Sequence, residues 1–242
     1  MEESLYIVMP AYNEEANIVS VVEEWYPILD FGNEQSRLVI ADGGSKDNTL
    51  GILHDLQKKY PKLVVFSKPD TDHGTKVIFL YKYAIEQGVD WIFQTDSDGQ
   101  TLPSEFEGFW QKRHQYDAIL GNRTKRGDGN DRKFVEWVLR MYLFSFFGTM
   151  VPDANAPFRL MKASMVNKYI SLMPDDFNLP NAILAMSFKK YGEKLAFDEI
   201  TFRPRQGGKN YMNKKRIFQI GKKALSDFRQ LKKNFAHFDT AK

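Results

Sequence analysis

Two aspartates separated by one residue, Asp96 and Asp98, are the strongest candidates for chemistry in this sequence. They stand in the segment TDSDGQ, directly after an apolar run. On extended backbone two such carboxylates point the same way, and on a turn both can reach one ion. Mg²⁺ and Mn²⁺ prefer oxygen ligands and commonly combine one or two carboxylates with the phosphates of a substrate. The segment therefore indicates a metal site that neutralises a departing diphosphate, although it also suits a plain polar turn.

Polar segments follow the other apolar runs of the first half as well. They are PAYNE at 10–14, DGGSKDN at 42–48, DTDHGTK at 70–76 and GNR at 121–123. Asp42 could accept a hydrogen bond from the N–H of a nucleobase, because the glycines after it allow close approach of backbone. A structural explanation is also open for the first segment: Asn13 suits a helix N-cap, and Glu14 suits the positive end of the helix dipole.

Short apolar runs alternate with segments of helical length. We expect strands at 5–9, 38–41, 63–66, 91–94 and 118–120, and helices at 14–29, 47–60, 75–87 and 103–115. This β-α-β-α order predicts an α/β fold with a parallel sheet covered by helices on both faces. Ligands of such sheets bind at the carboxyl ends of the strands, where the polar segments stand. The second half predicts helices at 133–147, 163–170 and 179–190, strands at 158–161 and 195–202, and an amphipathic helix at 214–235.

Composition is ordinary for a globular protein, with 43% hydrophobic and 27% charged residues among 242. Cysteine is absent from the sequence, which excludes disulfides and thiolate metal sites and favours a reducing, cytoplasmic compartment. The opening MEESLYIVMPAYNEE lacks the basic-then-apolar layout of a signal peptide. The aromatic run Trp137, Tyr142, Phe144, Phe146 and Phe147 is interpreted as core, and His73 and His114 as exposed or hydrogen-bonded histidines rather than metal ligands.

Charge divides unevenly along the chain. Residues 1–121 carry 10 Lys and Arg against 20 Asp and Glu, whereas residues 122–242 carry 24 against 11. A basic second half suits an anionic membrane surface, a phosphorylated substrate or nucleic acid, and a solvated basic face explains it equally well. The basic amphipathic helix at the C-terminus predicts peripheral contact with the inner face of a membrane.

Taken together, VMPAYNEE, DGGSKDNT, TDSDGQ, GNR and D-x-N-x-P-F-R-L closely resemble, in order and spacing, the motifs of family-2 glycosyltransferases with the GT-A fold. The wording of the later motifs is similar to soluble bacterial members that build surface polysaccharides and to the dolichol-phosphate mannosyltransferase-like branch. The resemblance implies a Rossmann-like, mostly parallel sheet. It implies a catalytic domain at 1–211, with a nucleotide-sugar half at 1–121 and an acceptor half at 122–211, followed by the C-terminal helix at 212–242.

The resemblance also implies a role for each matching residue. Mg²⁺ or Mn²⁺ would be held by Asp96, Asp98 and Gln100, with Asp98 as the direct ligand, and Asp153 would be the general base. Residues 207–208 match a glycine-bearing loop that closes over the donor phosphates. The residues that would bind a UDP- or GDP-linked sugar are Pro10, Ala11, Tyr12, Glu14, Asp42, Lys76, Asp96, Ser97, Arg123, Arg203 and Arg205.

Three positions depart from the family pattern. Gly43 stands where the family often has a second acid, and Gly74-Thr-Lys76 replaces the usual G-K-G, which leaves the role of Lys76 open. Glu136 stands where phospholipid-acceptor members have a serine, and an acid there would repel an acceptor phosphate. The sequence therefore favours an inverting transfer to a hydroxyl of a glycan or lipid-linked acceptor, in surface polysaccharide or glycolipid biosynthesis, over transfer to polyprenyl phosphate.

Such a transfer needs a base for the hydroxyl proton, and Asp175 and Asp176 compete with Asp153 for that role. Two other function classes explain less of the sequence. A basic RNA- or membrane-surface-binding module would leave the polar strand ends unexplained, and no nucleic-acid partner is expected. A sugar-phosphate nucleotidyltransferase would need a glycine-rich loop after the first strand, where PAYNEE has no glycine.

Overall fold

The computed structural model describes residues 3–69, 72–123, 130–205 and 214–240, with the side chains of 130–135 and 214–222 left aside. This part of the chain forms a seven-stranded sheet in the order β3-β2-β1-β4-β6-β5-β7. All described strand pairs are parallel except those of β6, which runs antiparallel to both β4 and β5. The strands are β1 (Leu5–Ala11), β2 (Arg37–Asp42), β3 (Leu63–Ser67), β4 (Trp91–Gln94), β5 (Ala118–Asn122), β6 (Arg159–Lys162) and β7 (Leu195–Glu199).

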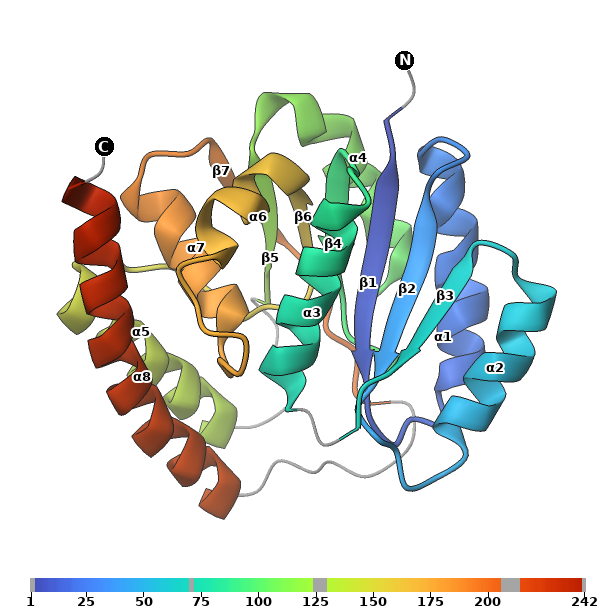
Figure 1. Ribbon diagram of the computed structural model, residues 1–242, viewed down its shortest axis with the longest axis horizontal. Helices are drawn as coiled ribbons and strands as arrows, with labels where there is room; N and C mark the ends of the chain where they lie inside the picture. The colour runs from blue at the N-terminus through green and yellow to red at the C-terminus, as the bar shows by residue number, and fades with distance from the viewer. Residues whose placement is uncertain (1–2, 70–71, 124–129, 206–213, 241–242) are drawn as a thin grey trace.

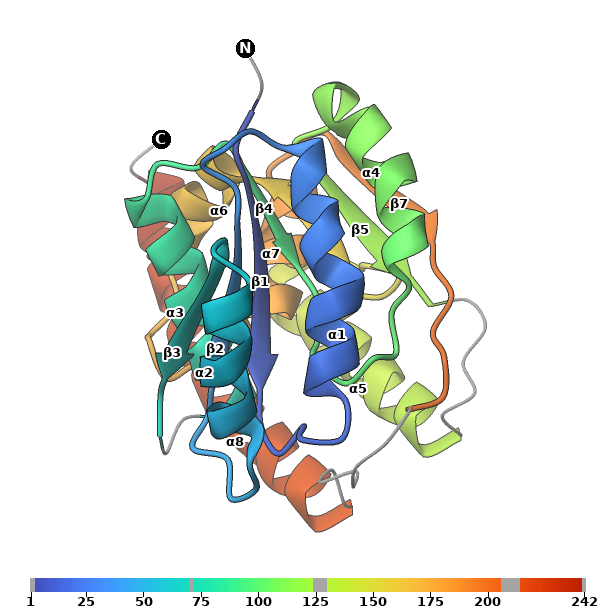
Figure 2. The ribbon, with the colours of Figure 1, turned by 90° about the vertical axis from the view of Figure 1, so that its right-hand side faces the viewer.

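Helices cover both faces of the sheet, as the edge-on view in Figure 2 shows. One face is covered by α3, α6 and α7, with α5 and α8 packed together beyond them, and the other by α1, α2 and α4 (Figure 1). The α-helices are α1 (Ile18–Trp25), α2 (Thr49–Lys59), α3 (His73–Glu86), α4 (Phe106–Lys112), α5 (Asn130–Phe147), α6 (Ala163–Ile170), α7 (Pro180–Lys190) and α8 (Lys214–Thr240). Short 3₁₀ helices are η1 (Tyr26–Phe31), η2 (Pro103–Glu105) and η3 (Arg113–Gln115).

The predicted fold class, a mostly parallel sheet between helices with an amphipathic helix at the C-terminus, is confirmed. The long helix expected at 14–29 is wrong in extent. Residues 14–17 form a turn, α1 begins at Ile18 with Asn17 as its N-cap, and Pro27 ends it in η1. Proline has no N–H to continue the ladder of hydrogen bonds. Glu14 therefore precedes the helix: its backbone carbonyl accepts the N–H of Ile18, and its carboxylate accepts the side-chain amide of the N-cap Asn17.

The aromatic run of α5 divides between core and surface. Tyr142, Phe146 and Phe147 pack around Phe228 of α8, with ring centroids 5.8–6.3 Å apart. Trp137 and Phe144 are 55% and 49% exposed, so the interpretation of the whole run as core is wrong for these two. The described helices include none long and apolar enough to span a membrane.

The start of α3 lies tightly against the loop that precedes α7. A Cβ at Gly74 would stand 2.3 Å from the carbonyl oxygen of Phe177 and 2.5 Å from backbone atoms of Asn178. Glycine is therefore required where these two backbones meet, because any side chain would force them apart. This contact fixes the loop after β3 relative to the second half of the chain. The domain division at 121/122 stays a prediction, and the division at 211/212 falls outside the described residues.

Candidate donor and metal site

The loops after β1, β2 and β4 meet at one edge of the sheet because these strands are parallel neighbours. The N–H of Gly43 donates to the carbonyl of Ala11 over 2.9 Å. The hydroxyl of Ser97 donates to the carbonyl of Pro10, also over 2.9 Å. These bonds tie the second and fourth loops to the end of β1. The predicted donor residues of the first half are therefore brought together.

Three carboxylates share this edge with one arginine. Arg205, from the segment after β7, contacts Glu14 at 2.5 Å and lies 3.8 Å from Asp98. The charge of Asp96 acts on both Glu14 and Asp98. The segment is held in place by Gln100, whose carbonyl accepts the N–H of Arg203 and whose side-chain amide donates to the Arg203 carbonyl, both over 2.8 Å. The segment after β7 therefore completes a site begun by β1 and β4.

Burial and mutual repulsion perturb two of these acids. Burial, and then the negative charge of Asp96, raise the pKa of Asp98 to about 7. Burial likewise raises the pKa of Glu14, against the lowering effects of Asn17 and Arg205. Carboxyl groups with a raised pKa are common at functional sites. A cation placed among them would relieve the repulsion and stabilise the ionised forms.

The donor set fits a metal ion that reaches the site with a diphosphate. Among the described residues no three His, Cys, Asp or Glu side chains converge as a ready-made metal site. Asp96 and Asp98 supply two carboxylates. The side-chain N–H of Gln100 donates to the Arg203 carbonyl, and its Oε1 as a further ligand stays a prediction. One or two carboxylates completed by substrate phosphates is the usual way in which proteins bind Mg²⁺. Asp96 and Asp98 would thus hold the ion, with nucleotide oxygens completing its shell.

A second group surrounds the end of β2. Asp42 is fully buried, and its carboxylate accepts the N–H of Gly44 and Ser45 over 2.9 and 3.0 Å and the hydroxyl of Ser45. Its bonds therefore shape its own loop before any ligand is present. The ammonium of Lys76 occupies the space that a side chain at Gly43 would take, since a Cβ there would lie 2.2 Å from it.

Gly43 and Lys76, two of the three departures from the family pattern, are thus explained by one packing contact. Lys76 is 3% exposed, and its Nζ lies 5.5 Å from the centroid of the Tyr12 ring. The missing acid at Gly43 makes room for this cation, which enters the site from α3. Lys76 therefore lies beside Gly43, the residue that follows Asp42, at the predicted nucleoside pocket.

On the acceptor side, Asp153 and Arg123 form a buried bidentate pair. Arg123 Nε and Nη2 donate to the two carboxylate oxygens of Asp153 over 2.7 and 2.8 Å. Burial acts to lower the pKa of Arg123, but the bonds to Asp153 outweigh it and the pKa is raised; Glu136 and Asp96 add to this effect. Asp153 is 1% exposed. The carboxylate predicted to take a proton is thus held by a guanidinium.

The competing base candidates lie elsewhere. Asp175 pairs with Lys82 of α3 at 2.5 Å, and Asp176 with Lys223 of α8 at 3.6 Å. Both carboxylates are more than three-quarters exposed. Exposed pairs of this kind contribute little to stability, and they lie in the loop before α7; a role of either acid as the base stays a prediction. The predicted phosphate-covering loop at 207–208 falls outside the described residues.

His73 is a site neighbour that the sequence analysis set aside. Its Nε2 lies 3.8 Å from Asp96 Oδ1, at the first position of α3. The signal was present in the sequence, because DTDHGTK follows a strand just as the other site loops do. The sequence alone is explained by an exposed histidine in this loop. The parallel order of β3, β2, β1 and β4 nevertheless brings the loop to the edge of the sheet where Asp96 lies.

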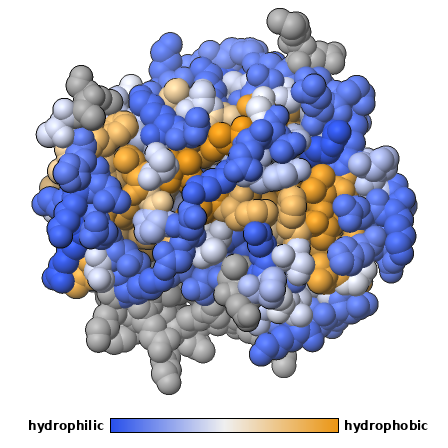
Figure 3. Space-filling model, in the orientation of Figure 1, coloured by the Kyte–Doolittle hydropathy of each residue, from blue (hydrophilic) through white to orange (hydrophobic). Residues whose placement is uncertain are grey.

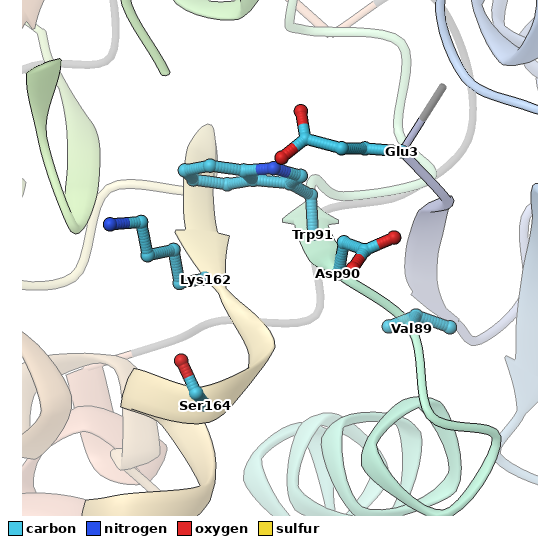
Figure 4. Close-up of a pocket in the computed structure, with 6 residues that line it drawn as sticks. All are labelled: Glu3, Val89, Asp90, Trp91, Lys162 and Ser164. Carbon is cyan, nitrogen blue, oxygen red and sulfur yellow. The ribbon is translucent and has the colours of Figure 1, made fainter. Parts of the chain in front are cut away.

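A separate hollow of about 240 Å³ opens at the other end of β4 (Figure 4). Its polar groups already have partners: Asp90 accepts the N–H and hydroxyl of Ser4, and Lys162 donates to Asp117. Trp91 begins β4 and Gln94 ends it, so this hollow lies away from Asp96. It takes no part in the candidate site.

Comparison with known proteins gives one family and a consistent set of relatives. The family model described as glycosyl transferase family 2 matches residues 6–171. The undecaprenyl-phosphate 4-deoxy-4-formamido-L-arabinose transferase of Shewanella sediminis is 24% identical over 76% of this chain and 55% of the relative. The undecaprenyl-phosphate mannosyltransferase of Micrococcus luteus is 22% identical over 85% of this chain and 86% of its own.

The fold is shared with a solved enzyme. Glucosyl-3-phosphoglycerate synthase of Mycobacterium tuberculosis, in complex with Mn²⁺, uridine diphosphate and glucosyl-3-phosphoglycerate, superposes with a TM-score of 0.69 at 16% identity. The match covers 95% of this chain and 80% of that one. The GT-A fold that the sequence resemblance implied is confirmed. The chain spans little more than half the length of the Shewanella relative.

Removing the charge of Asp98 should stabilise the metal-free protein. Because its pKa is raised in the fold, the stability that its protonated form contributes is present below the unfolded value near 4 and is lost as the pH rises through about 7. Asp98→Asn should therefore raise the melting temperature at pH 8, by about 2–4 °C for each kcal/mol relieved, and have little effect near pH 4. Thermal melts in EDTA from pH 4 to 8 measure this.

The matched control is Asp55→Asn, an exposed carboxylate on α2 whose pKa is lowered by Lys58. This substitution should not stabilise the protein at pH 8. A lower melting temperature for Asp98→Asn at pH 8 would show that the acid cluster is not repulsive.

Proposed function

This chain belongs to glycosyl transferase family 2 and is a glycosyltransferase, and we propose that it transfers a sugar from a nucleoside-diphosphate donor with Asp96 and Asp98 holding a divalent ion. The observation that carries the proposal is the arrangement of acids around Arg205, which contacts Glu14 at 2.5 Å and lies 3.8 Å from Asp98; burial and the neighbouring Asp96 raise the pKa of Asp98 to about 7. The M. tuberculosis enzyme of the same fold was solved with Mn²⁺ and uridine diphosphate. UDP- and GDP-sugars, with Mg²⁺ or Mn²⁺, are therefore the donors and ions to test.

In this proposal the metal, when bound, offsets the charge that builds on the leaving diphosphate. Arg205 already bridges Glu14 and Asp98 and would lie beside the phosphates. Asp42 and Lys76 would read a base that presents an N–H next to a carbonyl, as uracil and guanine both do. Pro10, Ala11 and Tyr12 would form the wall of the nucleoside pocket at the end of β1.

For the acceptor, we propose a lipid phosphate. A hydroxyl acceptor needs a base to take its proton, whereas a phosphate is already ionised. Asp153, the predicted base, is buried, and both of its carboxylate oxygens accept hydrogen bonds from Arg123, so an acceptor hydroxyl would have to compete with the guanidinium for them. The named relatives act on undecaprenyl phosphate. These observations favour the polyprenyl-phosphate alternative over the hydroxyl acceptor first preferred from the sequence.

A hydroxyl acceptor is kept as the second candidate because of Glu136. Its negative charge acts on Arg123, as that of Asp153 does, so both acids act on the Arg123 guanidinium. An acceptor phosphate would have to compete with both acids for Arg123. A neutral acceptor would not compete for Arg123, and Asp153 would take its proton only after Arg123 moves away.

We further propose peripheral contact with a membrane. The outer face of α8 is hydrophilic in the view of Figure 3, and its exposed residues include Arg229, Lys232 and Lys233. Trp137, Met141 and Phe144 form an exposed apolar stripe on α5, spaced four and three residues apart. Basic side chains attract anionic headgroups, and aromatic side chains favour the membrane interface. This contact would place a lipid acceptor within reach of the enzyme.

Donor binding should depend on Asp98. With Mn²⁺ and the correct UDP- or GDP-sugar at about 100 times Kd, the wild-type melting temperature should rise by about 5 °C or more, because ligand binding stabilises only the folded state. Asp98→Ala should show no such ligand-dependent rise. Asp175→Ala, an exposed acid outside the site, should behave as the wild type. Thermal melts across a panel of sugar nucleotides measure this, and a panel that shifts neither protein would refute the donor site.

Transfer should require a phosphate on the acceptor. With radiolabelled donor, the enzyme should glycosylate a short-chain polyprenyl phosphate and leave the matching polyprenol, which ends in a hydroxyl, unmodified. The physical reason is that Asp153 is not free to deprotonate the alcohol. Thin-layer chromatography of the lipid products measures both reactions. Transfer to polyprenol or to glycan hydroxyls alone would establish the second candidate.

Membrane binding should depend on the basic face of α8. Replacing Arg229, Lys232 and Lys233 with glutamine should reduce recovery with anionic vesicles in flotation more than tenfold at low salt, since each charge contributes about 1 kcal/mol. The control replaces the exposed Lys58, Lys59 and Lys112 with glutamine and should float as the wild type. Equal recovery of both variants would exclude α8 as the contact.

A further inference from the structure

A chain of buried polar side chains leads from α3 and α7 to Asp96. Tyr81 Oη donates to Asn181 Oδ1 over 2.7 Å, and Asn181 Nδ2 donates to Gln94 Oε1 over 2.8 Å. Gln94 Nε2 then donates to Asp96 Oδ1 over 3.2 Å. Tyr81 and Gln94 are fully buried and Asn181 is 3% exposed. We call these three residues the polar chain; they stand beneath the metal site rather than in it.

The carboxylate of Asp96, at the end of the polar chain, sets the direction of every hydrogen bond in it. An ionised carboxylate only accepts hydrogen bonds, so Gln94 must turn its NH₂ toward Asp96. Its carbonyl oxygen then faces Asn181, which must present its own NH₂, and the remaining oxygen of Asn181 accepts the Tyr81 hydroxyl. Each donor therefore points toward Asp96. Reversing any amide would leave two oxygens facing each other in a buried place, which is costly.

Asn181 also anchors the acceptor loop through its backbone. Its carbonyl accepts Arg159 Nη1 over 2.9 Å, while Arg159 Nε and Nη2 donate to the carbonyls of Ala156 and Ala154 over 3.1 and 3.0 Å. Arg159 is fully buried, and the loop that it holds carries Asp153. The side chain of Asn181 thus connects to Asp96 through Gln94, and its backbone carbonyl connects through Arg159 to the loop that carries Asp153.

We infer that Asn181 is a positioning residue for metal binding: through Gln94 it fixes Oδ1 of Asp96 and leaves the other carboxylate oxygen for the ion. The inference rests on the proposed function of Asp96 as a ligand. Groups that hydrogen-bond to metal ligands set the ligands' orientation, and removing them commonly costs 10–100-fold in metal affinity. Asn181 lies in the first turn of α7, so the helix determines where Asp96 points.

The experiment is a double-mutant cycle on Asn181 and Gln94. The dissociation constant of uridine diphosphate (or guanosine diphosphate, whichever the wild type binds) is measured by calorimetry in Mn²⁺ and again in EDTA. Asn181→Leu and Gln94→Leu should each weaken binding about tenfold in Mn²⁺ and change it less than twofold in EDTA. The double variant should be no weaker than either single variant, because both act through the same carboxylate.

The double variant replaces both partners of the Asn181–Gln94 hydrogen bond with apolar side chains, so neither of these two is left facing an unpaired amide. The Tyr81 hydroxyl loses its acceptor in Asn181→Leu and in the double variant alike, so that loss cancels when the two are compared. Tyr169→Phe is the matched control for loss of a buried hydrogen bond: it removes a fully buried tyrosine hydroxyl that donates to Glu193, away from Asp96. It should leave both dissociation constants unchanged.

Equal weakening in Mn²⁺ and EDTA would show a purely structural role and overturn the inference. Unchanged affinity in Asn181→Leu, or additive losses in the double variant, would overturn it too. A wild type whose nucleotide affinity ignores Mn²⁺ would instead refute the proposed metal site itself, and the inference with it.

Discussion

Repulsion among carboxylates at the end of the sheet is the constraint around which this site is built. Glu14, Asp96 and Asp98 lie where the strands β1 and β4 end, and burial removes much of the water that would screen them. Arg205 offsets part of the charge, yet the pKa of Asp98 still rises to about 7. A fold that keeps such a cluster gives up stability, as functional sites commonly do. A bound cation would neutralise these carboxylates and restore the stability that their repulsion costs.

Several distant parts of the chain serve this cluster. The segment after β7 is bound to Gln100 and brings Arg205 across the site, while the polar chain from α3 and α7 reaches Asp96 from beneath. Gly74 allows the start of α3 to contact the loop before α7, and this contact sets the position of α3 relative to α7. The acids lie at the ends of β1 and β4, whereas Asn181 and Arg205 come from later in the chain and reach them through the polar chain and through ion pairs. The site therefore depends on contacts between distant parts of the chain.

Much of this could be predicted from the sequence because strand ends and their polar loops are local signals. The loops after β1, β2 and β4, and with them Asp42 and Asp98, follow from the order of apolar runs. The antiparallel entry of β6 between β4 and β5 could not, because pairing partners are not encoded locally. Contacts between distant residues were missed for the same reason: the hold of Arg123 on Asp153, and the seat of Lys76 at Gly43, appear only in three dimensions.

The central claim is that a divalent ion belongs between Asp96 and Asp98, brought by a nucleoside diphosphate. The most direct measurement is a crystal structure with Mn²⁺ and uridine or guanosine diphosphate, with data collected to give the anomalous signal of manganese. The account predicts an anomalous peak within bonding distance of the Asp98 carboxylate and of the diphosphate oxygens. Nucleotide bound at this edge without a peak, or a peak away from both aspartates, would contradict it.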